Sequence, residues 1–397
     1  MRLCAAIVTC TLVLSQTASA LPNVPALLGH KRNHISNINR ELAGKVIDYS
    51  DNHGRDYRVW SAALGEKRSM YVYLPPGYDG TTAYPVMIWL HGFGQAEKNF
   101  LDIITDIDRG IQNGKFPPCV IASPDGSLHG RPALIKGGSF YMNSKAGRYE
   151  DYIVHDIWAF MLNNYRIRPE REAHVLAGAS MGGYGAFMLG FSHRETFGVI
   201  GGILPPLDVR YADCNDYYFS PYDPNCIMER DHVRRFRVIA NFHGIKVRER
   251  RLTDSLLGRR APDGLRPLAA VNPVEMLVNL DIRPGEFAMF IGYAGRDEFN
   301  LNAQADHFLD VARQRGICAT TLFLPDGNHS VATGKRMIPE FAAWLSTTLS
   351  PYVPACERNT LTNVGPAYDL LTSPAPVQYF GQPGLFEQAS LWPIQSR

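Results

Sequence analysis

The fold is decided by residues 173–189, which read AHVLAGASMGGYGAFML. The apolar run over 173–177 predicts a buried strand, and the small residues from Gly182 to Leu189 predict a helix. Between them stands a G-x-S-x-G pattern, Gly178-Ala179-Ser180-Met181-Gly182. A strained strand-to-helix turn of this kind lifts its serine above the sheet and brings the flanking positions close together, so glycine is needed at both. We therefore expect Ser180 to be a nucleophile.

The alternation of strand and helix continues in both directions along the chain. Continuous apolar runs predict further buried strands at 85–90, 119–123, 198–204, 287–293 and 320–324, and apolar periodicity predicts helices at 151–163, 303–314 and 337–349. Strands that alternate with helices indicate a mostly parallel central sheet with helices on both faces. Residues 57–63 and 69–74 predict an antiparallel hairpin at the edge of this sheet.

The first twenty residues have the features of a secretory signal peptide. Arg2 precedes an apolar stretch over 3–14, and the small residues Ala18-Ser19-Ala20 come directly before Leu21. The stretch is too short to act as a membrane anchor. We expect cleavage before Leu21 and a secreted or periplasmic protein without a membrane span.

The rest of the chain divides by changes in its pattern. Residues 21–56 lack a clear period and predict an irregular N-terminal arm, whereas 57–350 carry the pattern of one α/β catalytic domain. An insertion at about 205–270 interrupts this pattern beside the carboxyl edge of the sheet and predicts a cap. Residues 351–397 predict a proline-rich C-terminal tail.

A serine nucleophile needs a base, and a carboxylate to orient that base. His329 lies in a turn after the strand at 320–324, where loops at the carboxyl ends of strands converge. Asp297 follows the strand at 287–293, so the chain order is Ser, Asp, His, as in the α/β-hydrolase fold. Asp208 and Glu298 remain rivals for the role of the acid.

The oxyanion of an acyl-transfer reaction needs two N–H donors. Met181, at the start of the helix, supplies one, and the loop after the strand at 85–90 supplies the second. We nominate the N–H of Phe93, with Gly92 and Gly94 allowing close backbone approach. His91 is expected to brace this loop rather than to act in catalysis.

These motifs carry a family resemblance. Residues 71–78 (YVYLPPGY), 84–86 (YPV), 90–92 (LHG) and 178–186 (GASMGGYGA) resemble the esterase D and antigen 85 group, which includes feruloyl and acetyl-xylan esterases, S-formylglutathione hydrolases and mycolyltransferases. The resemblance covers about residues 57–350. It implies a triad of Ser180, Asp297 and His329 and an oxyanion hole from Phe93 and Met181, and it leaves the substrate pocket undefined.

The insertion is the expected location of a disulfide and of part of the substrate pocket. Cys214 and Cys226 flank a polar, aromatic loop, and a disulfide that closes such a loop persists in an oxidising compartment. Candidates for the pocket are Tyr184, Tyr217 and Tyr218, although a cap that packs its own core explains the tyrosines of the insertion equally well.

Neither a metal nor a cofactor is expected. The chain has no Cys/His cluster typical of zinc and no glycine-rich nucleotide loop, and the acids Asp208, Asp213, Asp216 and Asp223 lack the spacing of a calcium loop. Cys119 and Cys318 lie in apolar runs, so we expect both to be buried free thiols.

Hydrolysis of a carboxylic ester, of plant-polysaccharide type or with a small acyl group, is the first hypothesis, because water is the default acceptor. Acyl transfer to a sugar alcohol through the same acyl-enzyme on Ser180 remains open. An intact triad disfavours a binding protein on a decayed hydrolase fold. The formal net charge of +2 is compatible with a small ester substrate and gives no reason to expect a nucleic-acid partner.

Overall fold

The computed structural model describes residues 35–131, 137–242 and 244–354, which belong to one compact unit that ends at Pro354. The expected signal peptide, its cleavage point before Leu21 and residues 355–397 of the expected tail lie outside the described residues. In the described part of the chain, no helix is both long enough and apolar enough to cross a membrane.

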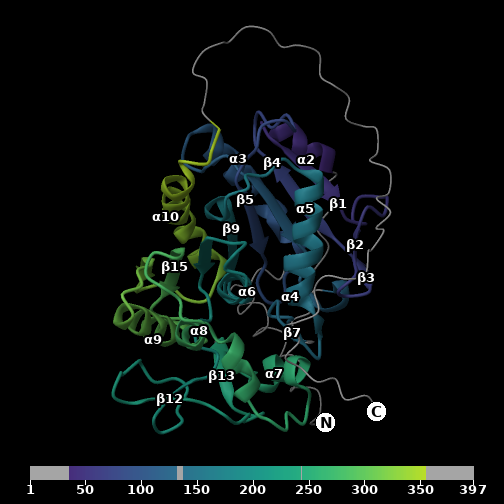
Figure 1. Ribbon diagram of the computed structural model, residues 1–397. Helices are drawn as coiled ribbons and strands as arrows, with labels where there is room; N and C mark the ends of the chain where they lie inside the picture. Colours follow the sequence, from purple (N-terminus) through teal and green to yellow (C-terminus); the bar gives the residue numbers. More distant parts are fainter. Residues whose placement is uncertain (1–34, 132–136, 243, 355–397) are drawn as a thin grey trace, which may run out of the picture. The chain divides into compact units, whose positions relative to one another are not determined.

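An eight-stranded sheet forms the centre of this unit, with the strand order β1-β4-β6-β5-β9-β10-β15-β16 (Figure 1). Neighbouring strands from β6 to β16 pair in parallel, and β4 runs antiparallel to both β1 and β6. The strands are β1 (Lys45–Tyr49), β4 (Met70–Leu74), β5 (Val86–Leu90), β6 (Val120–Pro124), β9 (His174–Ala179), β10 (Val199–Ile203), β15 (Ala288–Ala294) and β16 (Thr320–Leu324). The expected mostly parallel sheet is confirmed.

The order of the strands reverses beside β5. From β5 the chain moves to β6 on one side, and from β9 it moves through β10 and β15 to β16 on the other side. In open α/β sheets, ligand sites form outside the carboxyl ends of the strands at such a reversal. The loops that follow Leu90 and Ala179 leave β5 and β9 at this point, because these two strands are parallel neighbours.

Helices cover both faces of the sheet and close two hydrophobic cores (Figure 1). The first core is formed with α4 (Tyr149–Asp151), α5 (Trp158–Asn164), α6 (Met181–Ser192), α8 (Pro273–Asn279) and α9 (Leu301–Gln314). The second is formed with α2 (Ile35–Glu41), α3 (Ile104–Gln112) and α10 (Val331–Leu349). A π-helical turn at Tyr152–Ile157 joins α4 to α5, so the helix predicted at 151–163 is one continuous helical segment.

The prediction of an irregular N-terminal arm is wrong over its described part. Residues 35–41 form α2, and β1 pairs along its whole length with β4. The Asn39 side chain makes hydrogen bonds to both the N–H and the carbonyl of Val46, which ties the helix to the strand. Polar side-chain contacts of this kind leave no apolar period, so the pattern of the sequence could not reveal them.

The predicted edge hairpin pairs differently from expectation. β2 (Val59–Ser61) pairs with β3 (Glu66–Arg68) outside the main sheet, whereas β4 is an interior strand because β1 covers its outer edge. Residues 70–73 of β4 are accordingly fully buried. A second short pair, β7 (Asn143–Ser144) with β8 (Gly147–Arg148), precedes α4.

The insertion follows β10 and lies at one end of the sheet (Figure 1). Its elements are β11 (Tyr211–Asp213), β12 (Ile227–Glu229), β13 (Val238–Phe242), β14 (Ile245–Arg248) and α7 (Arg250–Leu257). The predicted disulfide between Cys214 and Cys226 is present and closes the loop between β11 and β12. Arg230 and Glu249, both buried, form an ion pair of 2.6 Å that joins the end of β12 to the start of α7.

The two free cysteines of the described residues differ in exposure. Cys119 is buried before β6, as expected. Cys318 is exposed, which corrects the prediction of a buried thiol. The reason is that it precedes β16, the edge strand, whose side chains are exposed or only half-buried.

Candidate active site

Ser180 lies in the turn between β9 and α6, in a conformation that residues other than glycine rarely adopt. Its φ is 52° and its ψ is −118°. The Ser180 N–H donates to the carbonyl of Ile203 on the neighbouring strand β10, at 2.8 Å. A strained residue persists only where its surroundings hold it, and such residues gather at functional sites. The strand–turn–helix context that the motif requires is therefore present.

Gly178 and Gly182 have no space for a side chain. A Cβ at Gly178 would stand 2.5 Å from the carbonyl oxygen of Leu90, and one at Gly182 would stand 1.9 Å from the same oxygen. That oxygen belongs to β5, so the collision could be relieved only by moving a central strand. The glycines thus let the serine turn pack directly against the end of β5.

Ser180, His329 and Asp297 form an unbroken chain of hydrogen bonds. The Oγ of Ser180 lies 2.9 Å from Nε2 of His329, and Nδ1 of His329 lies 2.8 Å from Oδ2 of Asp297. A carboxylate only accepts, so the proton sits on Nδ1, and Nε2 is left to accept from the serine hydroxyl. The structure therefore brings together the nucleophile, base and acid that the sequence predicts.

The pKa of His329 is set by opposing effects. Burial lowers it, because burial disfavours the imidazolium cation. The charge and hydrogen bond of Asp297 act in the opposite direction, as does the charge of Glu298, and together they raise the pKa above its usual value of 6.5. The carboxylate of Asp297 is fully buried, so water does not screen this interaction.

The two rival acids occupy other places. Asp208 is buried but directs Oδ2 to Nδ1 of His307, at 2.8 Å, and makes no contact with His329. Glu298 accepts the backbone N–H of His329 at 2.7 Å. Asp297 holds the ring of His329 and Glu298 holds its backbone, a role that no pattern in the sequence announces.

Two backbone N–H groups flank Ser180. Met181 opens α6, so its N–H has no acceptor within the helix. A Cβ at Gly92 would lie 3.6 Å from the Cβ of Ser180, which places the loop of Gly92, Phe93 and Gly94 beside the serine. Among the described residues, neither the Phe93 N–H nor the Met181 N–H has a hydrogen-bond partner. Two free donors beside a nucleophile suit a developing oxyanion.

His91 braces this loop, as expected. Its Nε2 accepts the N–H of Gly126 at 2.9 Å, so its proton lies on Nδ1, which contacts the carbonyl of Gly92 at 2.9 Å. The ring is buried, and these two hydrogen bonds tie it to backbone atoms of Gly92 and Gly126. Gln95 adds a second brace, because its Oε1 accepts the N–H of Gly92 at 2.9 Å.

Comparison with known proteins identifies the family. The model of a family described as "Putative esterase" matches residues 61–260, about half of the chain, and this span includes Ser180 and the loop of Phe93. The chain belongs to this esterase family. The matched span ends before Asp297 and His329, so the places of these two residues rest on the geometry described above.

Individual relatives of this esterase are distant. An S-formylglutathione hydrolase of Arabidopsis thaliana is 23% identical over 205 residues, which is 45% of this chain and 70% of the relative. An S-formylglutathione hydrolase of Paracoccus denitrificans is 23% identical over 63% of this chain and 90% of the relative. A solved ferulic acid esterase structure superposes with a TM-score of 0.56, at 18% identity, over 77% of this chain and 98% of that structure. These likenesses agree with the α/β-hydrolase fold.

Of the three tyrosines considered for the substrate pocket of this esterase, two are buried. Tyr184 is fully buried and donates to the carbonyl of Val271 at 2.8 Å, because its position on α6 faces the core. Tyr218 is 7% exposed and donates to the carbonyl of Phe299 at 2.8 Å, so it supports the loop after Asp297. The hydroxyls of both tyrosines are thus engaged by backbone carbonyls, and their place in a substrate pocket stays a prediction. Tyr217 is 58% exposed.

One aromatic side chain that the sequence reasoning missed does touch His329. The ring of Phe299 packs edge-on against that of His329, with centroids 4.9 Å apart. Phe242, at the end of β13 in the insertion, packs against Phe299 at 5.4 Å. The insertion therefore reaches the catalytic histidine candidate through two aromatic rings.

A second cluster of titratable side chains lies around Asp208. Atoms of Asp208, Glu229 and His307 that could bind a metal lie within 4.8 Å of one another. Neither oxygen of Glu229 meets a donor, although both are buried. Burial and the charge of Asp208 raise the pKa of Glu229 to about 10. The raised pKa favours a protonated Glu229, which could then donate to the neighbouring carboxylate of Asp208.

The four aspartates considered for calcium do not gather into one site. Asp216 forms ion pairs with Arg234 and Arg237, and Asp213 accepts the N–H of Tyr217 at 2.8 Å. Asp208 belongs to the cluster with Glu229 described above.

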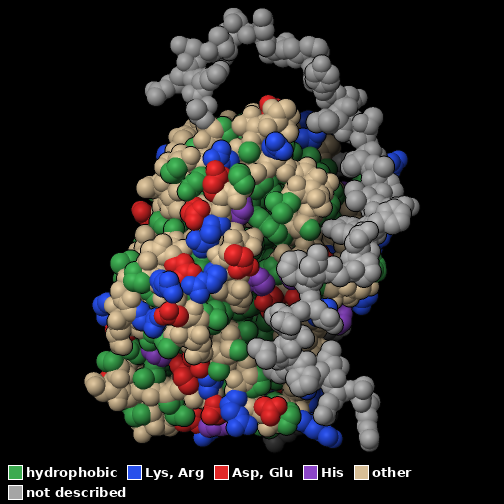
Figure 2. All heavy atoms as spheres, viewed as in Figure 1, with side chains coloured by type: hydrophobic (Ala, Val, Ile, Leu, Met, Phe, Trp, Pro, Cys, Tyr) green, Lys and Arg blue, Asp and Glu red, His purple; other side chains and the backbone are tan. Residues whose placement is uncertain are grey.

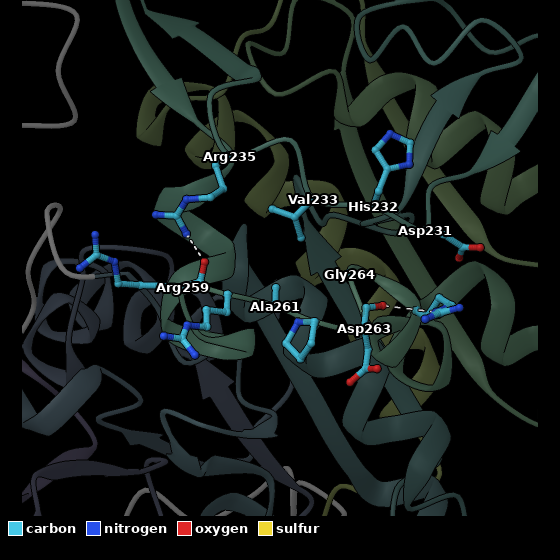
Figure 3. A pocket seen from close by; sticks show the side chains of 11 residues that line it. Asp231, His232, Val233, Arg235, Arg259, Ala261, Asp263 and Gly264 are labelled. Atoms are coloured by element: carbon cyan, nitrogen blue, oxygen red, sulfur yellow. Dashed lines mark hydrogen bonds between the residues drawn. The ribbon is translucent and has the colours of Figure 1, made fainter.

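A hollow of about 380 Å³ lies in the insertion (Figure 3). None of Ser180, Asp297 and His329 lines it, and its walls come from residues 231–235 and 259–266. Arg235 is engaged by Asp254 and by the carbonyl of Arg259. Charges of both signs are also interspersed on the face seen in Figure 2.

Proposed function

We propose that this chain is an exported serine carboxylesterase that cleaves esters through an acyl-enzyme on Ser180. One observation carries the proposal: the continuous hydrogen-bond chain from Ser180 Oγ through His329 to Asp297, with distances of 2.9 and 2.8 Å. A serine hydroxyl is a weak nucleophile unless a neighbouring base removes its proton. In the proposed mechanism His329 is that base, because its hydrogen bond to Asp297 leaves Nε2 free to accept the proton of Ser180.

The first half-reaction forms the acyl-enzyme. Nε2 of His329 takes the proton of Ser180 as Oγ bonds to the carbonyl carbon of the ester, and the negative charge moves to the carbonyl oxygen. The N–H groups of Phe93 and Met181 stabilise that oxyanion. The imidazolium then gives its proton to the alcohol oxygen as the carbon–oxygen bond breaks, so the alcohol leaves and the acyl group stays on Oγ.

The second half-reaction releases the acid. Water loses a proton to Nε2 of His329 and attacks the acyl carbon, which again places a negative charge on the carbonyl oxygen. Collapse of this intermediate breaks the bond to Oγ, and His329 returns the proton to Ser180. Asp297 remains ionised throughout and stabilises the imidazolium in both halves.

The proposed substrates are esters with small acyl or hydroxycinnamoyl groups. The names of the relatives, S-formylglutathione hydrolase and ferulic acid esterase, define these two acyl classes. The pair of rings formed by Phe299 and Phe242 beside His329 offers apolar contact to an aromatic acyl group. Export rests on the signal-peptide pattern of residues 1–20.

A panel of esters tests the proposal. The purified chain is assayed with aryl esters of increasing acyl length and with methyl hydroxycinnamates, alongside Ser180→Ala. Ser123→Ala is the matched control, because Ser123 is buried and its hydroxyl has no partner. We expect turnover by wild type and Ser123→Ala, and none above background by Ser180→Ala. Equal turnover by Ser180→Ala contradicts the proposal, and ester products formed in added sugar alcohol identify an acyltransferase instead.

A further inference from the structure

Tyr141 is a fully buried residue that touches both elements carrying the proposed oxyanion donors. Its hydroxyl donates to the carbonyl of His91 at 3.0 Å, one residue before the loop of Phe93. Its ring lies against α6, because a Cβ at Gly185 would stand 2.7 Å from the ring. The N–H of Met181 opens that same helix. One side chain thus spans the gap between the two donor-bearing elements.

The contact of Tyr141 belongs to a closed cycle of hydrogen bonds. The His91 ring accepts the N–H of Gly126 at 2.9 Å, and the carbonyl of Gly126 accepts the hydroxyl of Ser139 at 2.6 Å. The hydroxyl of Ser139 accepts the N–H of Tyr141 at 3.2 Å, and Tyr141 returns to His91. Each member is buried, so water does not compete for these bonds.

The cycle is anchored from the opposite side by Arg68. This arginine is 1% exposed and donates to the backbone carbonyls of Asp125 and Ser127, on either side of Gly126. Gly126 therefore cannot turn its N–H away from His91 without breaking these bonds. His91, which leads to Phe93, is therefore held by Tyr141 on one side and by the Gly126 segment, anchored on Arg68, on the other.

The backbone around Tyr141 is strained. Phe140 and Tyr141 both have positive φ, at 51° and 55°, which bulky residues rarely adopt. Such strain persists where the surroundings over-determine a conformation, and it concentrates at functional sites. The same segment also lies against the side chains of the two donor residues, because a Cβ at Gly138 would stand 2.6 Å from the sulfur of Met181 and 2.8 Å from the ring of Phe93.

We infer that Tyr141 is a positioning residue of the oxyanion site, which holds the His91 loop and the start of α6 at the separation that lets the N–H groups of Phe93 and Met181 converge on one oxygen. This inference rests on the proposed function. Burial raises the pKa of Tyr141 well above 10, so its hydroxyl stays protonated and remains a donor at the pH at which the esterase would work.

Tyr141→Phe tests the inference, because it removes only the hydroxyl. Tyr211→Phe is the matched control: Tyr211 is 1% exposed, its hydroxyl donates to the carbonyl of Ser220 at 3.1 Å, and it lies in the insertion. Both variants and wild type are assayed for kcat and KM with the best ester. We also measure the affinity of each protein for a trifluoromethyl ketone that carries the same acyl group. Such a ketone forms a tetrahedral oxyanion on Ser180.

We expect Tyr141→Phe to lower kcat about tenfold with KM within about twofold, since removing an oxyanion donor outright costs roughly 100- to 1,000-fold and misplacing one costs less. Ketone affinity should fall by the same factor, whereas Tyr211→Phe should stay within about twofold of wild type. A purely structural role would move both variants alike. If Tyr141→Phe does not fold, Ser139→Ala, which breaks the cycle elsewhere, should weaken ketone binding in the same direction.

The outcomes separate the two claims. An active wild type in which neither Tyr141→Phe nor Ser139→Ala weakens ketone binding more than Tyr211→Phe overturns the inference and leaves the proposed function standing. A wild type without ester turnover or ketone affinity overturns both.

Discussion

Replacing Asp297 by Asn should disable the base while leaving the fold intact. Oδ1 of Asp297 accepts the N–H of Phe299 at 2.9 Å, and Oδ2 accepts Nδ1–H of His329 at 2.8 Å. In the asparagine the amide oxygen keeps the bond from Phe299, so the amide NH2 faces Nδ1. That NH2 can only donate, which moves the imidazole proton to Nε2, where it blocks acceptance from Ser180.

The loss in turnover should be roughly 1,000- to 10,000-fold by analogy with serine-protease triads. At about 1.36 kcal/mol per tenfold, this corresponds to about 4 to 5.4 kcal/mol of transition-state stabilisation. Initial rates with the best ester of the panel, on protein shown to be folded by circular dichroism, measure it. The acid limb of the residual kcat/KM profile should also move to lower pH, because the charge that raises the pKa of His329 is gone.

The two rival acids are the controls. Glu298→Gln keeps an oxygen that can accept the His329 N–H, and Asp208→Asn acts at His307, so each should cost far less than Asp297→Asn. The assignment is refuted if folded Asp297→Asn keeps more than about a tenth of wild-type turnover while either control loses nearly all of it.

Three further predictions concern stability and processing. Relative to wild type, Glu229→Gln should raise the free energy of unfolding, and the gain should grow as pH rises above the ordinary glutamate pKa of 4.5, because the folded wild type must keep a proton on Glu229 until its pKa of about 10. Urea unfolding of both proteins at pH 5 and pH 8 measures this difference. A variant less stable than wild type at pH 8 favours a metal site instead. Loss of the Cys214–Cys226 disulfide, by serine at both positions, should lower the free energy of unfolding by about 3 kcal/mol, and non-reducing peptide maps with both thiols free would contradict the pairing. The exported chain should begin at Leu21 by intact mass, and a retained leader rejects this.

The parallel core of the fold could be predicted because strands buried on both faces leave continuous apolar runs. The runs at β5, β9, β10 and β15 identified strands to within a few residues. β1 was missed because only Val46 of its residues is buried, and its attachment to α2 relies on the polar side chain of Asn39. A half-exposed edge strand carries too weak a period for recognition.

The residues of the candidate site divide in the same way. Ser180 and His329 could be found because each stands in a turn directly after a strand of the sheet, where the fold gathers its loops. Glu298 and Tyr141 could not, because their contacts are with backbone atoms of His329 and His91, and a contact with backbone leaves no signal in residue type. The burial of Tyr184 could not be predicted, because its nearness to the nucleophile in sequence did not reveal which face of α6 it occupies.

The central claim is that Ser180 is a nucleophile activated by His329, and covalent labelling tests it most directly. The purified chain is treated with a fluorophosphonate, and the adduct is located by peptide mass mapping in wild type, Ser180→Ala and His329→Ala. The hydrogen bond of 2.9 Å between Oγ and Nε2 predicts one adduct, on Ser180, formed rapidly in wild type, absent in Ser180→Ala and slowed at least 100-fold in His329→Ala. An adduct on another residue, or equal labelling of wild type and His329→Ala, would contradict the account.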